Sequence, residues 1–543
     1  MEEIKNKLKE IIRGLFGVEM EPEVTVAPGN TGADYATNVA MRLAKEVGKN
    51  PREIAAAIVE KYGEGIEIAG PGFLNFILSD EYYLNKVSDL RDNFAKNISN
   101  MIYSGKKVIC EFSDPNPFKV LHVGHLYTSI VGDSISRLFE FAGADVVRAN
   151  FGGDVGLHVA KTIWAMITNG VKDFTIEDVA KCYVEGTRAY EGDEKAHAEI
   201  VRLNKEIYNI AQNDIHDGEI AEIYWKGREL SYQYFEDFYA RIGVKFDKYY
   251  PESTVAERGL AEVRKGLDEG VYEMSDGAVV YHGEKVGLHT RVFINKEGLP
   301  TYEAKDVGLI FTKWDEYEFD KSVVITGNDI IDYMKVVLSS VGEMNPELPK
   351  RTAHLTHGQV KLPGNEKMSS RKGNFLKAVD TIEMVQKELG AEKADFRVVM
   401  AAIKYAFLKY KVGGDIIFDP QESVAMTGNS GVYILYSVVR SKKIIGKCTK
   451  EGDEVFALNK FEKNLCKKMV QYAEVLKEAI NEMAPYKVCN YLYELAQEFS
   501  RFYENCQVAG SDEEVQRKKF VQVYKEIMEH GLGLLGIEIP EEM

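Results

Sequence analysis

The sequence predicts an α/β protein with a parallel, Rossmann-like central sheet, a small N-terminal α/β domain and an all-helical C-terminal region. An apolar run at Val108–Phe112, an amphipathic pattern at Leu126–Phe141 and a second strand-like run at Asp145–Asn150 follow one another in the central part. Strand, helix and strand at this spacing are typical of a βαβ unit in a parallel sheet. After about residue 420 the apolar pattern is helical to the end of the chain, which predicts the helical region.

The N-terminal domain is expected to consist of short helices and strands. Apolar residues recur at helical spacing over residues 39–47. The segment Asn50–Glu53 offers a cap, a proline in the first turn and a glutamate, which is the composition of a helix start. Residues 66–68 and 73–78 are expected to be strands around the turn Gly70–Gly72.

A polar, acidic and mostly helical stretch separates the first strands of the central part from the later ones. It runs from about Trp164 to Asp247 and is typical of an insertion. Strand-like runs return at Val279–Tyr281 and Ser322–Thr326. In the C-terminal region a stripe of apolar residues steps by four and three, which predicts a buried helical face: Val488, Leu492, Leu495, Phe499 and Phe502.

The composition is that of an ordinary globular protein. Of the 543 residues, 45% are hydrophobic and 28% are charged, which is usual for a soluble protein, and no apolar run is long enough to span a membrane. The N-terminus is charged and helical in pattern and lacks the apolar core of a signal peptide. We therefore expect a cytoplasmic protein with no membrane partner.

Net charge and cysteine spacing bear on possible ligands. A formal net charge of −17 opposes binding to nucleic acid, because phosphates repel an acidic surface, although local basic faces can coexist with it. Arg440, Lys443 and Lys447 fall at helical spacing and form either such a basic face or an ordinary solvated one.

The six cysteines include no C-x-x-C pair, so neither a zinc ribbon nor a dithiol redox site is expected.

The first motif with chemical content lies between the first strand of the βαβ unit and its helix. It is the segment Ser113–Leu126, SDPNPFKVLHVGHL. In parallel sheets ligands bind at the carboxyl ends of strands, and a helix N-terminus suits phosphate. On a helix His122 and His125 share a face and can both donate to a triphosphate, while Gly124 leaves room for a base or ribose. The alternative is two surface histidines around a helix-start glycine.

The second motif is the segment Glu366–Asn374, EKMSSRKGN, which follows Gly364. Its three cations and two hydroxyls suit a flexible clamp for a polyphosphate. A closing loop of this kind can stabilise the charge that develops on leaving pyrophosphate. The alternative is a solvated charge run, the commoner fate of such strings.

Together, in this order and about 240 residues apart, the two motifs resemble the HIGH and KMSKS signatures of class I aminoacyl-tRNA synthetases. The details are closer to the arginyl-tRNA synthetases. The segments that carry this narrower resemblance are Pro115–His125, Arg148–Asn150, Gly153–Gly156, Lys367–Gly373, Asp34–Asn38, Gly70–Asn75, Asn490–Leu495 and the terminal Met543.

The resemblance covers essentially the whole chain and implies a domain plan. It implies a tRNA-contacting additional domain over residues 1–105, a class I Rossmann-like catalytic domain over 106–400 with a helical insertion at about 164–275, and a helical anticodon-binding domain over 401–543. It also implies an arginine–tRNA ligase that uses ATP with Mg²⁺ to form arginyl-adenylate from L-arginine and then charges the 3′ end of tRNA(Arg). A monomer without protein-bound zinc, whose activation step needs tRNA, is expected.

The resemblance places an amino-acid pocket beside the first motif. The side chains expected there are Ser113, Asn116, His125, Asn150, Tyr302, Asp306 and Asn328. Tyr302 and Asp306 share a helical face, and a carboxylate with a phenol suits a guanidinium. Without the resemblance they are an ordinary half-buried tyrosine and a surface charge.

The ATP side is expected to lie next to this pocket, with residues 358–360 against adenine. The residues expected to bind ATP are Lys119, His122, Gly124, His125, Gly358, Gln359, Val360, Lys367, Met368, Ser369 and Ser370. Those expected to act in catalysis are Lys119, His122, His125, Lys367, Arg371 and Lys372. No covalent nucleophile is needed, because positioning and electrostatic stabilisation suffice.

Two positions depart from the family pattern. Near Asn328 the family usually has glutamine, followed by a histidine that is absent here, and the fourth place of the second motif is Ser370 instead of lysine. Lys119 is expected to compensate for the second departure. Two other functions stay open: a class I synthetase for cysteine or lysine, against which the missing zinc ligands count, and a non-catalytic paralogue that binds tRNA as a regulator.

Overall fold

The centre of the fold is a parallel sheet. Its strands are β5 (Lys107–Glu111), β6 (Asp145–Gly152), β7 (Lys248–Pro251), β11 (Lys321–Gly327) and β12 (Thr352–His357), in the order β12-β11-β5-β6-β7. Every neighbouring pair is parallel. From β5 the chain moves outward through β6 and β7, and it later returns to β11 and β12 on the other side of β5. The order therefore reverses between β5 and β11, and such switch points bind ligands in parallel sheets.

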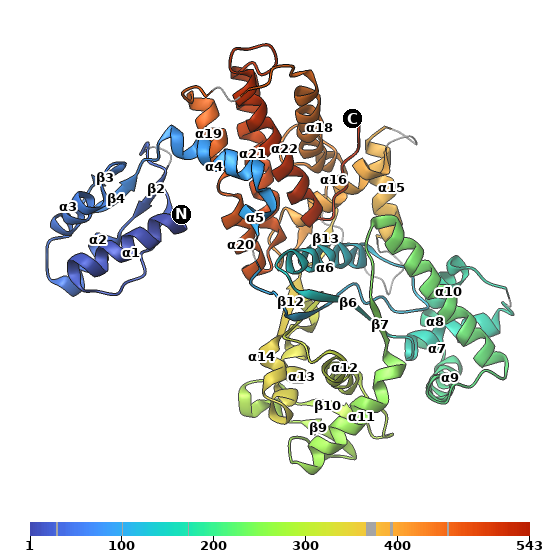
Figure 1. Ribbon diagram of the computed structural model, residues 1–543. Helices are drawn as coiled ribbons and strands as arrows, with labels where there is room; N and C mark the ends of the chain where they lie inside the picture. Colours follow the sequence, from blue (N-terminus) through green and yellow to red (C-terminus); the bar gives the residue numbers. More distant parts are fainter. Residues whose placement is uncertain (29–30, 100, 172, 365–375, 391–394, 453–454) are drawn as a thin grey trace. The chain divides into compact units, whose positions relative to one another are not determined.

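The computed structural model describes residues 1–28, 31–99, 101–171, 173–364, 376–390, 395–452 and 455–543 (Figure 1). The chain divides into two compact units, which are described separately. One unit consists of Met1–Asn97, Ser441–Tyr472 and Gln497–Lys525, and the other of Ile98–Arg440, Ala473–Ala496 and Glu526–Met543.

The predicted βαβ unit is confirmed. Val108, Ile109 and Cys110 of β5 are fully buried, as expected where both faces of a parallel sheet are covered. Helix α6 (Val123–Phe141) connects β5 to β6 and is buried over most of its length. It begins at Val123, before the predicted start at Leu126, because His122 caps it.

Helices fill the connection between β6 and β7, as predicted for Trp164 to Asp247. They are α7 (Leu157–Thr168), α8 (Ile176–Gly192), α9 (Glu194–Gln212) and α10 (Glu219–Ile242) (Figure 1). Their buried side chains form one hydrophobic cluster that includes Phe118 of the first motif. Phe118 has a φ of 65°, an uncommon value for a bulky residue. Packing against the insertion therefore holds the motif loop in its conformation.

The remaining elements of this unit surround the central sheet. The strand predicted at Val279–Tyr281 is β9 (Ala278–Tyr281), but it belongs to a separate antiparallel sheet with β8 (Glu273–Ser275) and β10 (Arg291–Ile294). The run predicted at Ser322–Thr326 is β11. The other elements are α11 (Glu252–Asp268), η1 (Gly283–Val286), α12 (Tyr302–Tyr317), η2 (Asn328–Ile330), α13 (Ile331–Met344), α14 (Glu347–Arg351), β13 (Val360–Lys361), α15 (Ala378–Glu388), α16 (Phe396–Leu408), β14 (Ile416–Ile417) and α17 (Pro420–Ser423).

The N-terminal part is the predicted α/β module. An antiparallel sheet in the order β1-β2-β4-β3 lies beside three helices and shares a hydrophobic core with them. Asn50 caps the third helix by accepting the backbone N–H of Arg52 at 2.9 Å, with Pro51 in the first turn. The elements are α1 (Glu2–Phe16), β1 (Thr25–Val26), β2 (Tyr35–Thr37), α2 (Val39–Val47), α3 (Pro51–Tyr62), β3 (Ile66–Ala69) and β4 (Phe73–Phe76), followed by α4 (Asp80–Asp92) and α5 (Phe94–Ile98).

The C-terminal region is helical, as predicted. Its helices are α18 (Gly431–Lys447), α19 (Lys460–Met469), α20 (Tyr472–Glu482), α21 (Pro485–Asn505) and α22 (Glu514–Leu534). The predicted apolar stripe lies on α21, and all five of its residues are fully buried: Val488, Leu492, Leu495, Phe499 and Phe502.

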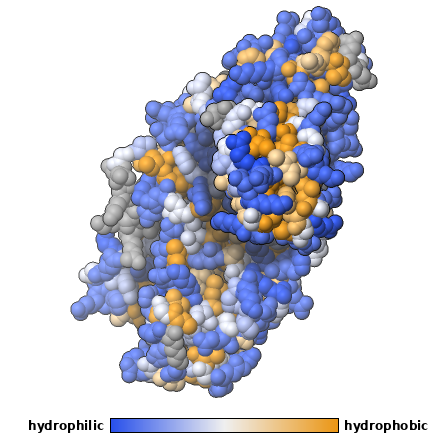
Figure 2. All heavy atoms as spheres, turned by 90° about the vertical axis from the view of Figure 1, so that its left-hand side faces the viewer, coloured by the Kyte–Doolittle hydropathy of each residue, from blue (hydrophilic) through white to orange (hydrophobic). Residues whose placement is uncertain are grey.

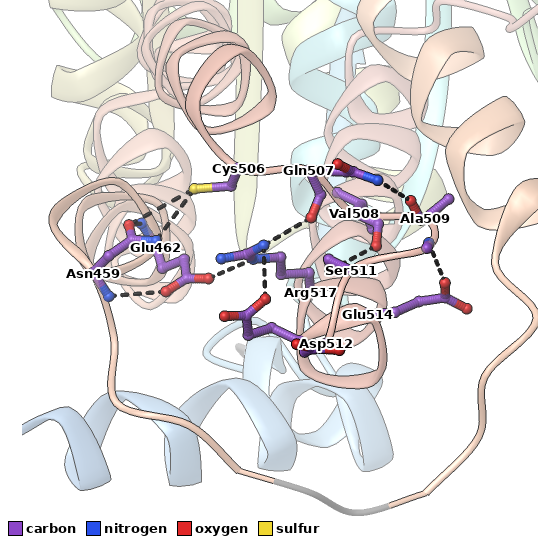
Figure 3. Close-up of polar contacts among 12 residues, drawn as sticks. Asn459, Glu462, Cys506, Gln507, Val508, Ala509, Ser511, Asp512, Glu514 and Arg517 are labelled. Carbon is purple, nitrogen blue, oxygen red and sulfur yellow. Dashed lines mark hydrogen bonds and ion pairs between the residues drawn. The ribbon is translucent and has the colours of Figure 1, made fainter.

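A polar cluster holds the start of α19 to α22 (Figure 3). Asn459 accepts the backbone N–H groups of Phe461 and Glu462, and Glu462 accepts the backbone N–H of Asn459 at 2.8 Å, which forms a capping box. The other Glu462 oxygen accepts from buried Arg517 at 2.7 Å. The cap therefore fixes the carboxylate that neutralises Arg517.

Asn459→Ala is expected to destabilise α19 by about 1 kcal/mol, the usual effect of losing an N-cap. Amide hydrogen exchange in residues 460–469 would accelerate about 5-fold as a result. Lys460→Ala, an exposed change at the next position, is the matched control and should leave exchange unchanged. Equal exchange rates in the two variants would show that the cap contributes nothing.

Figure 2 shows one face of the molecule, on which hydrophilic residues predominate and apolar ones form separate patches. Exposed large apolar side chains of the N-terminal module include Leu15, Val26 and Phe73. No described helix is long and apolar enough to cross a membrane.

Candidate active site

A cavity of about 1070 Å³ opens at the switch point of the central sheet. The carboxyl ends of β5 and β11, the start of α6 and the segment after β12 form its walls. The residues that line it are Ser113, Asp114, His122, Val123, Gly124, His125, Thr128, Ile325, Thr326, Gly327, Asn328, Asp329, His357, Gly358, Gln359, Val360, Lys361, Leu376 and Asp415. Eight of the predicted site residues thus meet around one cavity: Ser113, His122, Gly124, His125, Asn328, Gly358, Gln359 and Val360.

The two motif histidines form a stacked pair at the start of α6. Their ring centroids are 3.7 Å apart with 23° between the planes. His122 is the N-cap, and its Nδ1 accepts the N–H of Gly124 at 3.1 Å, while Nδ1 of His125 accepts the N–H of His122 at 3.1 Å. Because each Nδ1 is an acceptor, the proton of each neutral ring lies on Nε2.

Both histidines are neutral at physiological pH. Burial, together with the nearby charge of Lys119, lowers the pKa of His122 to about 4. Burial and the neighbouring His122 lower the pKa of His125 well below its usual range. The pair therefore offers hydrogen-bond donors to an anion in the cavity without carrying charge of its own.

Gly124 is required by the histidine pair itself. A Cβ built on Gly124 would lie 2.8 Å from Cε1 of His122, a distance that real Cβ atoms do not show. The expectation that a base or ribose lies near this glycine stays a prediction.

Ser113 and Asn150 are both hydrogen-bonded to the hydroxyl of one tyrosine, which the sequence did not indicate. The Tyr239 hydroxyl lies 2.8 Å from Oγ of Ser113 and accepts from Nδ2 of Asn150 at 3.2 Å. Asn116 accepts the backbone N–H of Gly153 through Oδ1 at 2.9 Å. Tyr239 comes from α10 of the insertion, so no local pattern around the first motif signals it.

Asp306 is hydrogen-bonded to a tyrosine that the sequence did not single out. The hydroxyl of Tyr333 on α13 donates to Oδ2 of Asp306 on α12. Tyr302, one turn earlier on α12, is 60% exposed, and the hydrogen bond to the carboxylate comes from Tyr333 instead. Burial raises the pKa of Asp306 from 3.8 to about 7, although the hydrogen bond from Tyr333 acts in the opposite direction.

Two buried ion pairs brace the helix that carries Asp306. Lys305 donates to Glu252 at 2.6 Å and to the Tyr208 hydroxyl at 2.7 Å, and Lys313 donates to Glu111 at 2.5 Å. Although burial acts against it, Glu252 raises the pKa of Lys305 above its usual value. The sequence did not single out these pairs, because their partners lie far apart along the chain.

The predicted adenine segment lies against a neighbouring turn. The backbone N–H of Gln359 donates to Asp415 at 2.8 Å, and β13 pairs with β14. A Cβ on Gly358 would lie 2.4 Å from the backbone nitrogen of Asp415, so only glycine fits this close approach. Asn328 donates through Nδ2 to the carbonyl of Gly413 at 3.2 Å.

Other predicted site residues do not line the cavity. Among the described residues, Asn116, Asn150, Tyr302 and Asp306 are not part of the cavity lining. Lys119 places its ammonium 5.0 Å from the ring of Tyr183 on α8. The predicted phosphate clamp lies outside the described residues, and with it Lys367, Met368, Ser369, Ser370, Arg371 and Lys372.

Three family models match the chain. The model described as tRNA synthetases class I (R), catalytic domain, matches residues 91–419. The DALR anticodon binding domain matches residues 434–543, and the arginyl tRNA synthetase N terminal domain matches residues 2–78.

Relatives and solved structures are similar over the full length. The arginine–tRNA ligase of Fusobacterium nucleatum is 29% identical over 582 residues, covering 100% of this chain and 99% of that protein. That of Treponema denticola is 29% identical over 601 residues, covering 100% of both. The arginyl-tRNA synthetase structures of Plasmodium falciparum and Thermus thermophilus have TM-scores of 0.81 and 0.75 at 22% and 23% identity, and each covers 100% of this chain and at least 99% of its own.

Proposed function

The chain belongs to the class I arginyl-tRNA synthetase family, and from this premise we propose that the switch-point cavity activates arginine with ATP and that the chain then charges tRNA(Arg). The observation that carries the proposal is the neutral, stacked His122–His125 pair at the helix start of a large switch-point cavity. It provides donors for phosphate where parallel sheets bind nucleotides. Asp306, close by, provides a carboxylate for a guanidinium.

In the first step the arginine carboxylate attacks the α-phosphorus of ATP in line. The new P–O bond forms arginyl-adenylate as the bond to the bridging oxygen breaks, and pyrophosphate leaves with the electron pair. The Nε2–H groups of His122 and His125 stabilise the charge that develops on the phosphates, and no proton needs to be transferred. Mg²⁺ enters with ATP as part of the substrate, held mainly by phosphates and water.

In the second step a terminal ribose hydroxyl of tRNA attacks the activated carbonyl. The ester bond to tRNA forms, the bond between the carbonyl carbon and the phosphate oxygen of the adenylate breaks, and AMP leaves with the electron pair while its phosphate takes up the proton of the attacking hydroxyl. Holding both reactants in one cavity makes this step effectively unimolecular.

Aminoacylation of bulk tRNA by the purified protein, with each amino acid in turn, tests the function. Charging with arginine and with no other amino acid is the expected result. Charging with cysteine or lysine instead would identify another synthetase. Tight tRNA binding without any charging would identify a tRNA-binding paralogue.

The activation step is expected to depend on tRNA. We expect ATP–pyrophosphate exchange with arginine to be at background without RNA and to appear when tRNA(Arg) is added, because the tRNA end completes the active site. A non-cognate tRNA is the control. Full exchange in the absence of RNA would contradict this prediction.

Reversing the charges of Arg440, Lys443 and Lys447 on α18 is expected to weaken tRNA binding about 10-fold and to lower its salt dependence by a slope of about 2–3. Lys443 and Lys447 are exposed and Arg440 is half-buried, so phosphates can reach this stripe. Reversal of the exposed Lys181, Lys195 and Lys205 produces the same change in net charge and is the control. Equal effects of the two triple variants would show that only the global charge matters.

The domain plan of residues 1–105, 106–400 and 401–543, a monomeric state and a cytoplasmic location are part of the same proposal. Sedimentation of the purified protein tests the monomer, and fluorescence microscopy of a tagged chain tests the location.

A further inference from the structure

Tyr333 on α13 contacts the carboxylate of Asp306 from outside the helix α12 that carries it. The hydroxyl of Tyr333 donates to Oδ2 of Asp306. The other oxygen, Oδ1, accepts no hydrogen bond from the described residues, and the half-buried Asp306 forms no ion pair with them. One carboxylate oxygen is therefore engaged within the protein, and the other is left for a ligand.

The ring of Tyr333 is itself held in place by an arginine on β10. The guanidinium carbon of Arg291 lies 5.2 Å from the centroid of the Tyr333 ring, within the range of a cation–π contact. Nη1 of Arg291 donates to Oε1 of buried Glu303 at 3.1 Å. Glu303 lies three residues before Asp306 and shares its face of α12. Elements β10, α12 and α13 thus fix the phenol against Asp306, while Glu303 neutralises Arg291.

The charges around Asp306 leave this carboxylate without a cation among the described residues. Titratable groups act on it from each neighbouring element: Glu111 on β5, Asp114 in the segment after β5, Glu252 on α11, Lys313 on α12 and Tyr333 on α13. Lys313 is bound to Glu111, and Glu252 is bound to Lys305. Both lysines are therefore neutralised by glutamates, and the substrate has to supply the cation that pairs with Asp306.

The hydrogen bond from Tyr333 acts on both the direction and the charge of Asp306. A guanidinium is planar and binds a carboxylate through directed N–H donors, so the orientation of the carboxylate matters. A donor on Oδ2 also favours the ionised form, which is the form that pairs with a guanidinium. We propose that Tyr333 is a positioning residue for the amino-acid substrate: by holding Oδ2, it directs Oδ1 of Asp306 to the guanidinium of arginine. This inference rests on the proposed function.

Tyr333→Phe removes the hydroxyl and keeps the ring, so the fold should be retained. Calorimetry on the full-length protein compares the affinities for arginine and citrulline from about pH 5 to about pH 9. Citrulline has the same α-carbon groups but a neutral urea, so the ratio of the two affinities cancels titrations elsewhere in the protein. In the wild-type protein this ratio should rise with a midpoint near the Asp306 pKa of about 7.

In Tyr333→Phe the midpoint should move up by about 1–2 pH units, and the ratio at neutral pH should fall roughly 10-fold, as for the loss of one hydrogen bond to a charged group. The pKa moves up because the bond from Tyr333 lowers it in the wild-type protein. In arginylation, KM for arginine should rise while kcat changes little, because the guanidinium contact is the same in the ground state and the transition state.

Tyr281→Phe is the matched control. The Tyr281 hydroxyl donates to Glu343 at 2.6 Å, so this variant also removes a tyrosine–carboxylate bond from α13, about 15 Å further along the helix. Its ratio and midpoint should equal those of the wild-type protein.

An unchanged midpoint in Tyr333→Phe, or an equal shift in Tyr281→Phe, would overturn the proposal. A ratio that does not depend on pH in the wild-type protein would also overturn it, because Asp306 would then not face the guanidinium. Failure of the wild-type protein to bind or charge arginine would instead refute the proposed function, which keeps the two failures distinct.

Discussion

Asp306→Asn is expected to lower kcat/KM for arginine by roughly 10²- to 10³-fold, as for the loss of one member of a hydrogen-bonded charge pair in a desolvated site. The substitution keeps the shape of the side chain and its bond to Tyr333 but removes the charge that is proposed to bind the guanidinium. ATP affinity should change little. Citrulline, whose urea is neutral, should be penalised less than arginine. Steady-state arginylation and competition binding measure these effects.

The pKa of Asp306 gives this prediction a pH dependence. Burial raises that pKa from 3.8 to about 7, and only the ionised carboxylate forms a charge pair. Arginine affinity of the wild-type protein should therefore rise as pH increases through about 7, and the dependence should disappear in Asp306→Asn. A raised carboxyl pKa also stabilises the unliganded fold at low pH, because the folded protein binds the proton more tightly than the unfolded chain does. This contribution to the free energy of unfolding is fully present below pH 3.8 and is lost as the pH rises through about 7.

Asp315→Asn is the matched control for Asp306. Asp315 lies on the same helix α12, is about half exposed and pairs with Arg258. Its substitution should leave kcat/KM unchanged and alter stability by less than about 0.5 kcal/mol. Near-native kcat/KM for Asp306→Asn would remove Asp306 from the amino-acid site.

Lys119→Ala is expected to slow adenylate formation by roughly 10²- to 10³-fold, the effect of losing one preorganised electrostatic donor. Ser370 supplies no charge at the fourth position of the second motif, so Lys119 should stabilise the phosphates in its place. Its ammonium lies near enough to lower the pKa of His122, which places the charge close to the histidine pair. Single-turnover formation of arginyl-adenylate in the presence of tRNA measures the effect.

Lys161→Ala provides the control for Lys119. Both lysines place their ammonium over a tyrosine ring, Tyr190 at 4.4 Å for Lys161 and Tyr183 at 5.0 Å for Lys119. Loss of a cation–π contact alone would therefore affect both variants alike. A normal rate for Lys119→Ala would show that Arg371 or Lys372 provides the charge instead.

Local patterns were sufficient for the elements and for the first motif. The βαβ unit around β5 and α6 was predictable because a buried parallel strand is continuously apolar and a covered helix repeats every three to four residues. His122 and His125 were predictable because their spacing and the preceding strand place them at a helix start. The boundary of α6 was three residues off, because the N-cap is a histidine, a residue type outside the usual capping set.

The sequence by itself determined the fold class and the family, because each short motif and each apolar pattern is formed by neighbouring residues and the motifs add up along the chain. Only the tertiary structure decided which phenol meets Asp306, that Tyr239 joins Ser113 to Asn150, and that Asp114 faces the cavity. These contacts join residues 27, 126 and 89 positions apart, or depend on a backbone turn held by the packing of Phe118. Hydrogen bonds and buried charges are selected by proximity in space, and proximity across such separations is set by the packing of the sheet and its helices.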